Sequence, residues 1–212
     1  HQQGNHTTGK TTTDKYASTT YFDSLGKALA AVDLDGDGTR ELVIGAPDAA
    51  VEVKDGNSQN ATKVPHLGKV FVVDGGSGLF DKSDKAVQDA AQSVFEGVIE
   101  NGRAGTTLAD AGDMNGDDID ELLIGSPHAY GGGGAVHVAF GSSNRTGDFK
   151  LDSTLKDTRV MEFQGQADSL AGSGAFNAGS LGSALAGIGD FNRNGEDDVF
   201  LGAPTTLAEF GS

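Results

Sequence analysis

Acidic side chains recur at fixed spacing in a short segment near the start of the sequence. Counted from its first residue, this segment places carboxylates at positions 1, 3, 5 and 9, which are Asp33, Asp35, Asp37 and Glu41. Alternate spacing on a tight loop directs successive side chains toward one centre, and the glycine at position 6 permits the turn that brings position 9 back. Oxygen ligands without nitrogen or sulfur suit Ca²⁺ far better than zinc or copper. The segment therefore predicts a calcium-binding loop.

Two further segments repeat this pattern with fewer charges. The second offers Asp113, Asn115, Asp117 and Glu121. The third offers Asp190, Asn192, Asn194 and Asp198. Asp118 replaces the glycine at position 6 of the second segment, and we expect a modest cost because aspartate tolerates a left-handed backbone. Because only two of its four ligand side chains are charged, the third segment is expected to bind calcium most weakly.

Two alternatives apply to acidic segments of this kind. An EF-hand loop begins similarly but needs an acidic ligand at position 12, where this sequence has Ile44, Ile124 and Leu201, so that alternative fails in all three copies. A single aspartate-rich loop is more often a solvated turn. Three aligned copies, each leading into an apolar run, favour metal binding.

The acidic segments belong to a longer internal repeat that must position them. The repeat aligns without gaps over residues 33–47, 113–127 and 190–204. Within it, short apolar runs bounded by glycine, such as residues 42–44 and 122–124, predict buried strands.

Further strands are predicted downstream of each of the first two acidic segments. They cover residues 68–73, 93–96, 135–140 and 160–163. Four short strands per repeat are typical of a β-propeller blade. Residues 84–93 instead predict a short helix between the third and fourth strands of the first repeat.

The repeats resemble the FG-GAP repeats of the N-terminal β-propeller of integrin α subunits. The resemblance covers residues 21–207 and rests on the triplets Gly45-Ala46-Pro47, Gly125-Ser126-Pro127 and Gly202-Ala203-Pro204, each joined to an acidic segment. The Phe-Gly half of the motif is replaced by Leu25-Gly26, Ala104-Gly105 and Leu181-Gly182. The resemblance implies an all-β fold of four-stranded antiparallel blades, with up to three structural Ca²⁺ ions. By analogy with the family, backbone carbonyls of Thr39, Ile119 and Glu196 complete the three sites.

Counting the repeats predicts two complete blades and a partial one. We expect a flexible N-terminal segment (residues 1–15), an orphan outer strand (16–22), a first blade (23–99), a second blade (100–165) and a partial third blade (166–212). Propellers need about four to eight blades to close, so the chain is expected to be incomplete alone. It is either a fragment of a larger propeller or a subunit that self-associates.

The composition of the chain limits the classes of partner that it is expected to bind. The formal net charge of −16 should repel phosphate backbones and anionic headgroups, so nucleic acid and an anionic membrane surface are unexpected partners. No run approaches the roughly 18 apolar residues of a membrane span. The absence of cysteine excludes disulfides and thiolate metal sites. Three N-glycosylation sequons, at Asn5, Asn60 and Asn144, indicate a secreted or cell-surface protein.

A non-enzymatic function is expected. The five histidines show no zinc spacing, and neither a Gly-x-Ser-x-Gly elbow nor a phosphate-binding P-loop occurs. The resemblance implies an extracellular adhesion module that binds a protein or glycan ligand through loops, with residues 48–66 and 128–134 as candidate contact surfaces. Two alternatives remain: a structural subunit that assembles head to tail into a filament or ring, and the non-catalytic propeller of a larger hydrolase or lyase.

Overall fold

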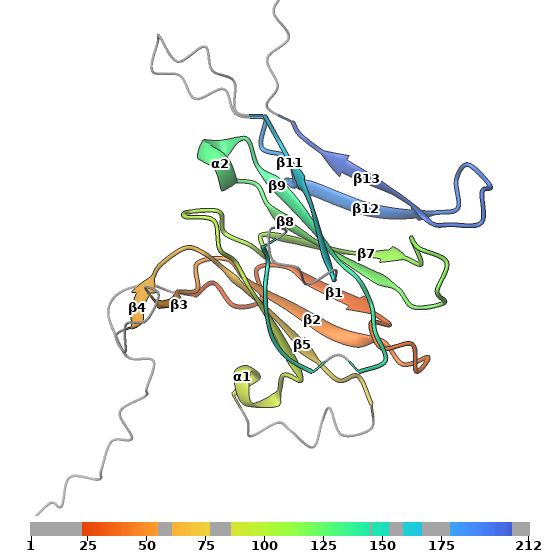
Figure 1. Ribbon diagram of the computed structural model, residues 1–212, viewed down its shortest axis with the longest axis horizontal. Coiled ribbons are helices and arrows are strands. Elements are labelled where there is room, and N and C mark those ends of the chain that lie inside the picture. Colours follow the sequence, from red (N-terminus) through yellow and green to blue (C-terminus); the bar gives the residue numbers. More distant parts are fainter. Residues whose placement is uncertain are drawn as a thin grey trace, which may run out of the picture.

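The computed structural model describes residues 23–54, 61–76, 86–144, 146–152, 159–166 and 179–204. Within them the regular secondary structure is almost all β-strand, as predicted, with two helices of four residues each, α1 (Val87–Ala90) and α2 (Ala129–Gly132) (Figure 1). The expected N-terminal segment and orphan strand, which include Asn5, lie outside the described residues, as does Asn60.

The first sheet contains an antiparallel blade. Its strands β1 (Leu29–Val32), β2 (Glu41–Ala46), β5 (Lys69–Val73) and β6 (Ser93–Glu96) lie side by side in that order. The strands predicted from the apolar runs are confirmed here. The helix predicted between the third and fourth strands is also confirmed as α1, although it is a single turn.

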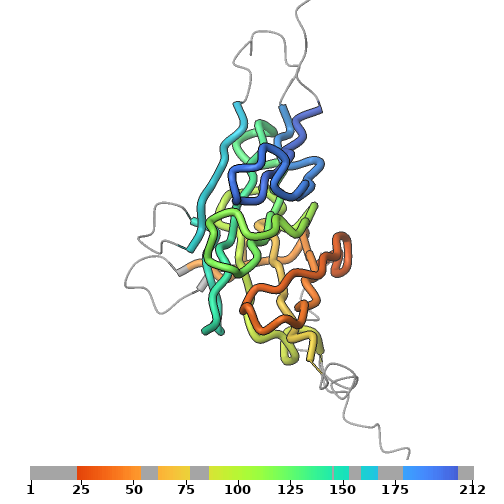
Figure 2. The backbone as a smooth tube through the Cα atoms, turned by 90° about the vertical axis from the view of Figure 1, so that its right-hand side faces the viewer, coloured from red at the N-terminus to blue at the C-terminus, as the bar shows by residue number. Residues whose placement is uncertain are grey.

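The second sheet repeats this arrangement, and a third begins it. Strands β7 (Thr107–Gly112), β8 (Glu121–Ser126), β9 (Ala135–Ala139) and β11 (Val160–Gln164) form the second antiparallel blade. Strands β12 (Ala184–Gly189) and β13 (Asp198–Gly202) form an antiparallel pair. The strand β7 packs between β1 and β12, and Figure 2 shows the three sheets following one another without closing a ring among the described residues.

Two pairings were not predicted from the sequence. Strand β10 (Gly147–Lys150), from the connection between β9 and β11, adds to the first sheet in parallel with β6. The Phe149 ring lies 5.5 Å from the Phe95 ring, and Lys150 forms an ion pair with Glu96. Strand β10 therefore connects the second blade to the first. The second unpredicted pairing joins strands β3 (Val51–Lys54) and β4 (Ala61–Val64), which form a hairpin within the insertion at residues 48–66.

The main core lies between the first two blades. It joins Val43, Val70 and Phe95 of the first sheet to Leu122 and Ile124 of the second, all fully or almost fully buried. Burial of such side chains is the dominant stabilising contribution in a fold of this type. The blades are therefore held together by apolar packing between their faces.

The glycine of the Gly-Ala-Pro triplet permits close contact between blades. A Cβ on Gly45 would lie 2.2 Å from the carbonyl oxygen of Gly105 in the next blade. A Cβ on Gly125 would lie 2.4 Å from the carbonyl oxygen of Gly182, so the same approach recurs between the second and third sheets. Glycine is required at these positions because any side chain would push the blades apart.

Candidate metal centres

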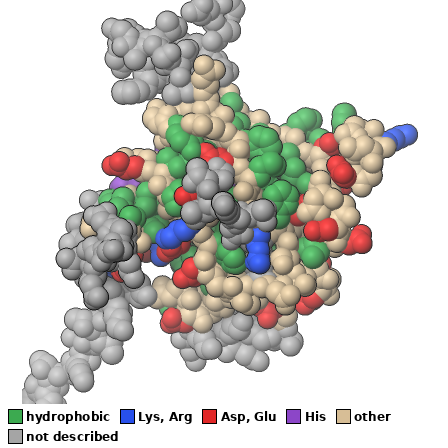
Figure 3. Space-filling model, in the orientation of Figure 1, with side chains coloured by type: hydrophobic (Ala, Val, Ile, Leu, Met, Phe, Trp, Pro, Cys, Tyr) green, Lys and Arg blue, Asp and Glu red, His purple; other side chains and the backbone are tan. Residues whose placement is uncertain are grey.

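The three acidic segments form loops at equivalent places in the fold. Loop 1 (residues 33–40) joins β1 to β2, loop 2 (113–120) joins β7 to β8, and loop 3 (190–197) joins β12 to β13. The ninth residue of each segment, Glu41, Glu121 or Asp198, is the first residue of the strand that follows. The loops emerge at one end of the sheets (Figure 1), where Figure 3 shows acidic side chains exposed.

In each loop the backbone wraps around the carboxylate at position 1. Asp33 accepts hydrogen bonds from the amides of Gly36 and Gly38, both at 2.9 Å. Asp113 accepts equivalent bonds from Gly116 and Asp118, at 2.7 and 2.9 Å. In loop 3, Asp190 accepts from Asn194 at 2.9 Å and from Gly195 at 3.0 Å. Side chains of this kind that bond to amides ahead of them stabilise tight turns.

The loops need a left-handed backbone at two positions. The φ angle at position 6 is 84° for Gly38, 65° for Asp118 and 95° for Gly195. The conformation predicted for Asp118 is therefore confirmed. Position 4 is also left-handed, a requirement that was not predicted, and its residues are Gly36 (φ 73°), Gly116 (φ 77°) and Arg193 (φ 62°).

The structure brings the first three ligand side chains of loop 1 together. Carboxylate oxygens of Asp33, Asp35 and Asp37 all lie within 4.8 Å of one another. Burial raises the pKa of Asp35, and repulsion from Asp37 and Asp33 adds to the effect. A cluster of oxygen donors at this separation, without nitrogen or sulfur, fits the coordination preference of Ca²⁺.

The carboxylate at position 9 is buried in the first two loops. Glu41 is 1% exposed, and its Oε2 accepts a 2.8 Å bond from the Leu34 amide. Glu121 is fully buried, and its Oε2 accepts a 2.7 Å bond from the Met114 amide. In the described part of the chain, neither carboxylate forms an ion pair with a basic side chain.

Burial raises the pKa of each of these two carboxylates to about 7. The amide of Leu34 opposes the shift at Glu41, while Asp35, Asp33 and Asp37 reinforce it. Repulsion from Asp117 and Asp113 contributes at Glu121. A bound cation would offset the unfavourable charge of both sites.

In loops 2 and 3, the side chains at positions 3 and 9 are joined by a hydrogen bond. The Nδ2 of Asn115 donates to Glu121 at 3.1 Å, and the Nδ2 of Asn192 donates to Asp198 at 2.9 Å. The residues expected to offer carbonyls donate their amides to position 5: Thr39 to Asp37 at 2.6 Å, Ile119 to Asp117 at 3.1 Å, and Glu196 to Asn194 at 2.9 Å.

Glu121 also accepts a hydrogen bond from a residue outside the repeated segment. The amide of Gly141, in the connection after β9, donates to Glu121 Oε1 at 3.3 Å. No local pattern marks this residue, because the contact spans 20 residues of sequence and depends on how the second blade folds.

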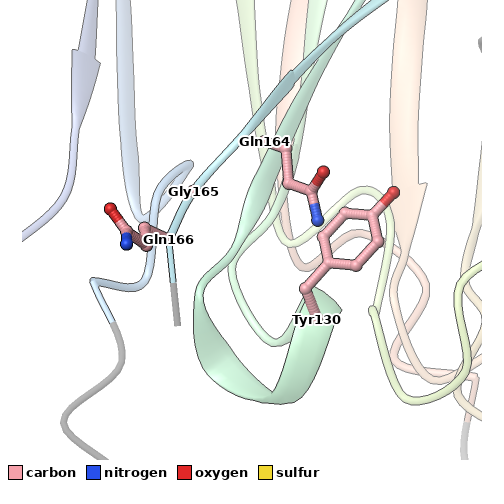
Figure 4. Close-up of a pocket in the computed structure, with 4 residues that line it drawn as sticks. All are labelled: Tyr130, Gln164, Gly165 and Gln166. Carbon is pink, nitrogen blue, oxygen red and sulfur yellow. The ribbon is translucent and has the colours of Figure 1, made fainter. Parts of the chain in front are cut away.

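The opposite end of the second blade carries a shallow pocket near one of the predicted contact loops. Its volume is about 590 Å³, and Figure 4 shows Tyr130 of α2 beside Gln164, with Gly165 and Gln166 completing the lining. Burial raises the pKa of Tyr130 to about 12, and its hydroxyl donates to Glu162. The pocket therefore offers aromatic and amide groups at the surface that includes residues 128–134.

The described helices are too short to cross a membrane. Among the sequons, Asn144 is exposed in a turn.

Comparison with known proteins finds repeats in the first two blades. The FG-GAP repeat family matches residues 25–67 and 105–138. The chain is 32% identical over 190 residues to "Integrin alpha pat-2" of Caenorhabditis briggsae, covering 88% of this chain and 14% of that protein. It is 29% identical over 190 residues to "Integrin alpha-5" of Xenopus laevis, covering 88% of this chain and 16% of that protein.

A relative of another kind also matches. The chain is 30% identical over 131 residues to "Phosphatidylinositol-glycan-specific phospholipase D" of Rattus norvegicus, covering 60% of this chain and 14% of that protein. The chain thus spans about one seventh of the length of these relatives. In agreement with the repeated blades and acidic loops, the chain carries FG-GAP repeats at residues 25–67 and 105–138 and is similar to integrin α subunits over 88% of its length.

Proposed function

We propose that loops 1, 2 and 3 each bind one Ca²⁺ ion that stabilises the connection between the first two strands of a blade. The proposal is carried by the convergence of Asp33, Asp35 and Asp37, together with the burial of Glu41, whose charge these three carboxylates repel. The other loops share the amide-wrapped carboxylate at position 1, which supports an equivalent site in each.

The proposed ligands are those expected from the sequence. Each site would use the side chains at positions 1, 3, 5 and 9 and the carbonyl at position 7. A calcium ion would supply the positive charge that these oxygen donors need when they are gathered at one place. The ions would have a structural role, with no part in a chemical step.

We propose that the blades act in extracellular adhesion or ligand binding. The likeness to integrin α subunits supports this function, as do the exposed sequon at Asn144 and the pocket beside Tyr130. The ligand would be a protein or glycan bound through residues 48–66 and 128–134. We also propose the blade boundaries 23–99, 100–165 and 166–212, a secreted or cell-surface location, and no enzymatic activity of this segment.

Calorimetric titration of metal-stripped protein with CaCl₂ tests the proposed sites. We expect three ions per chain in the wild type and two in the Asp37→Ala variant. Asp74→Ala, which changes a carboxylate outside the proposed ligands, is the control and should leave the stoichiometry unchanged. Failure of the wild type to bind any calcium would rule out the proposal.

Self-assembly is a second candidate, supported by apolar side chains on the first and third sheets. Leu29 on β1 is 61% exposed, and Phe200 on β13 is 62% exposed. Large apolar side chains at open sheets favour association with another surface. Either further blades of a longer chain or a second copy could cover them. Light scattering separates these outcomes, because a stable monomer of 21.6 kDa would argue against assembly of copies.

A third candidate is the propeller part of a larger enzyme, which the likeness to the phospholipase D supports. Assays for glycan or phospholipid hydrolysis by this segment test the proposed absence of activity.

A further inference from the structure

Backbone hydrogen bonds connect each acidic loop to the next. The amide of Asp120 in loop 2 donates to the carbonyl oxygen of Asp33 in loop 1 at 3.1 Å. The amide of Asp197 in loop 3 donates to the carbonyl oxygen of Asp113 in loop 2 at 2.9 Å. Both bonds join position 8 of one loop to position 1 of the loop before it. The connection is therefore a property of the repeat.

The bonded residues are proposed ligands or their direct neighbours. Asp33 and Asp113 supply the position 1 carboxylates, while Asp120 and Asp197 immediately precede the position 9 carboxylates of their own loops. A metal ion that fixes position 9 of one loop also restrains the adjacent amide. That amide in turn holds the first ligand residue of the preceding loop.

Close packing reinforces both connections. A Cβ on Gly36 in loop 1 would lie 2.9 Å from Cγ1 of Ile119 in loop 2. A Cβ on Gly112, just before loop 2, would lie 1.9 Å from Oδ2 of Asp197 in loop 3. The neighbouring loops are thus in contact through side chains as well as backbone, so one loop has little freedom to shift alone.

A second hydrogen-bonded route connects loops 1 and 2. The amide of Ser142 donates to the carbonyl oxygen of Leu34 at 2.8 Å. The adjacent amide of Gly141 donates to Glu121 at 3.3 Å. Two consecutive residues therefore bridge the backbone of loop 1 and the buried carboxylate of loop 2. No hydrogen bond joins loop 1 directly to loop 3 in the part of the chain that the structure describes.

We propose that calcium binds cooperatively to neighbouring loops, with loop 2 coupled to both others and loops 1 and 3 coupled only through loop 2. This inference rests on the proposed calcium sites. Ordering one loop restrains ligands of the next before its ion arrives, so the second ion meets a smaller ordering cost. Coupling of this kind is reciprocal: each site strengthens its neighbour by the same factor.

Nuclear magnetic resonance can follow each loop separately during a calcium titration. The amides of Gly36, Gly116 and Gly195 donate to the position 1 carboxylates of loops 1, 2 and 3, so each reports its own site. The matched variants are Asp37→Ala, Asp117→Ala and Asn194→Ala, which remove position 5 in one loop each. None of these residues takes part in the bonds between loops described above.

The expected pattern is specific. Asp117→Ala should weaken calcium binding at loops 1 and 3 by about 5–10-fold, toward the lower end of typical coupling factors. Asp37→Ala and Asn194→Ala should each weaken loop 2 by a similar factor, with a much smaller effect on the remaining distant loop. Unchanged affinity at the neighbouring loops would overturn the coupling.

The wild-type titration provides a measurement that does not depend on the folding of variants. Coupled sites give reporter curves steeper than single-site binding, whereas three independent single-site curves would overturn the inference. Absence of any calcium response in the wild type is a different result, because it removes the proposed sites themselves.

Discussion

The Glu41 carboxylate is buried at the first residue of β2 and accepts a 2.8 Å hydrogen bond from the amide of Leu34. One neutral donor offsets only part of the cost of burying a negative charge. Asp33, Asp35 and Asp37 gather their carboxylates nearby and add repulsion. We therefore expect loop 1 to depend on a bound cation, and the first two predictions follow from this expectation.

The Glu41→Gln variant should separate two effects of the buried charge: its cost to the stability of the metal-free protein and its contribution to calcium binding. The variant keeps an oxygen that can accept from Leu34 but removes the buried charge. We expect a higher melting temperature than wild type in EGTA at pH 8, and weaker calcium binding at loop 1 by at least about tenfold. Calorimetric titration and thermal unfolding of both proteins check this. Equal calcium affinities in the two proteins would show that Glu41 is not a ligand.

The metal-free protein should lose stability as pH rises through 7. Burial raises the pKa of Glu41 and of Glu121 from 4.5 to about 7. The folded state therefore binds these two protons more tightly than the unfolded state. Their contribution to the free energy of unfolding is fully present below pH 4.5 and is lost as the pH rises to about 7.

Thermal unfolding in EGTA between pH 5 and 8.5 measures this dependence. The double variant Glu41→Gln with Glu121→Gln is the control and should show a flatter profile over the same range. A wild-type melting temperature that rises from pH 6 to 8 would contradict the assignment.

Gly45→Ala should destabilise the packing of the first blade on the second. The added Cβ would lie 2.2 Å from the carbonyl oxygen of Gly105, which is too close without movement of the backbone. We expect a loss of about 1–3 kcal/mol in the free energy of unfolding, typical of an overpacked site.

Gly202→Ala is the matched control at the same motif position of the third repeat. Among the described residues, the nearest atom to its Cβ would be the Ala184 Cβ, at 3.1 Å. Denaturant unfolding should show a clearly smaller loss than for Gly45→Ala. Equal losses in the two variants would indicate that the contact between blades is not the cause.

Asp118→Gly should stabilise loop 2. Asp118 has a φ of 65°, which costs about 1–2 kcal/mol for residues other than glycine and less for aspartate. We expect a gain of about 0.5–1 kcal/mol in the free energy of unfolding, with calcium present throughout. Asp118→Ala should lower stability instead, because alanine keeps the Cβ without the tolerance of aspartate. A gain in both variants would point to charge removal rather than backbone strain.

The repeated pattern of the sequence allowed the blades and loops to be predicted, because both depend on local spacing. The runs at residues 42–44 and 122–124 lie within strands, and the acidic loops connect the first two strands of each sheet. The pairing of β10 with β6 was missed because Lys150 and Glu96 lie 54 residues apart, and nothing local to either strand marks the partner.

The candidate site was predicted only as a set of residue positions. Sequence spacing predicted Glu41 and Glu121 as ligands for loops 1 and 2, but the burial of these two side chains depends on strands contributed by the rest of each sheet. The bonds from Asp120 to Asp33 and from Asp197 to Asp113 require two blades in register. Such contacts follow from tertiary packing and have no sequence signature in one repeat.

Thermal unfolding of the wild-type chain with calcium and with excess EGTA tests the central claim most directly. When the free calcium concentration is 100 times the dissociation constant of a site, binding at that site stabilises the folded chain by about 2.7 kcal/mol. Three such sites should raise the melting temperature by at least about 10 °C. Magnesium at the same concentration controls for ionic strength and should raise it much less. Identical melting curves in calcium and in EGTA would contradict a structural role for calcium in these loops.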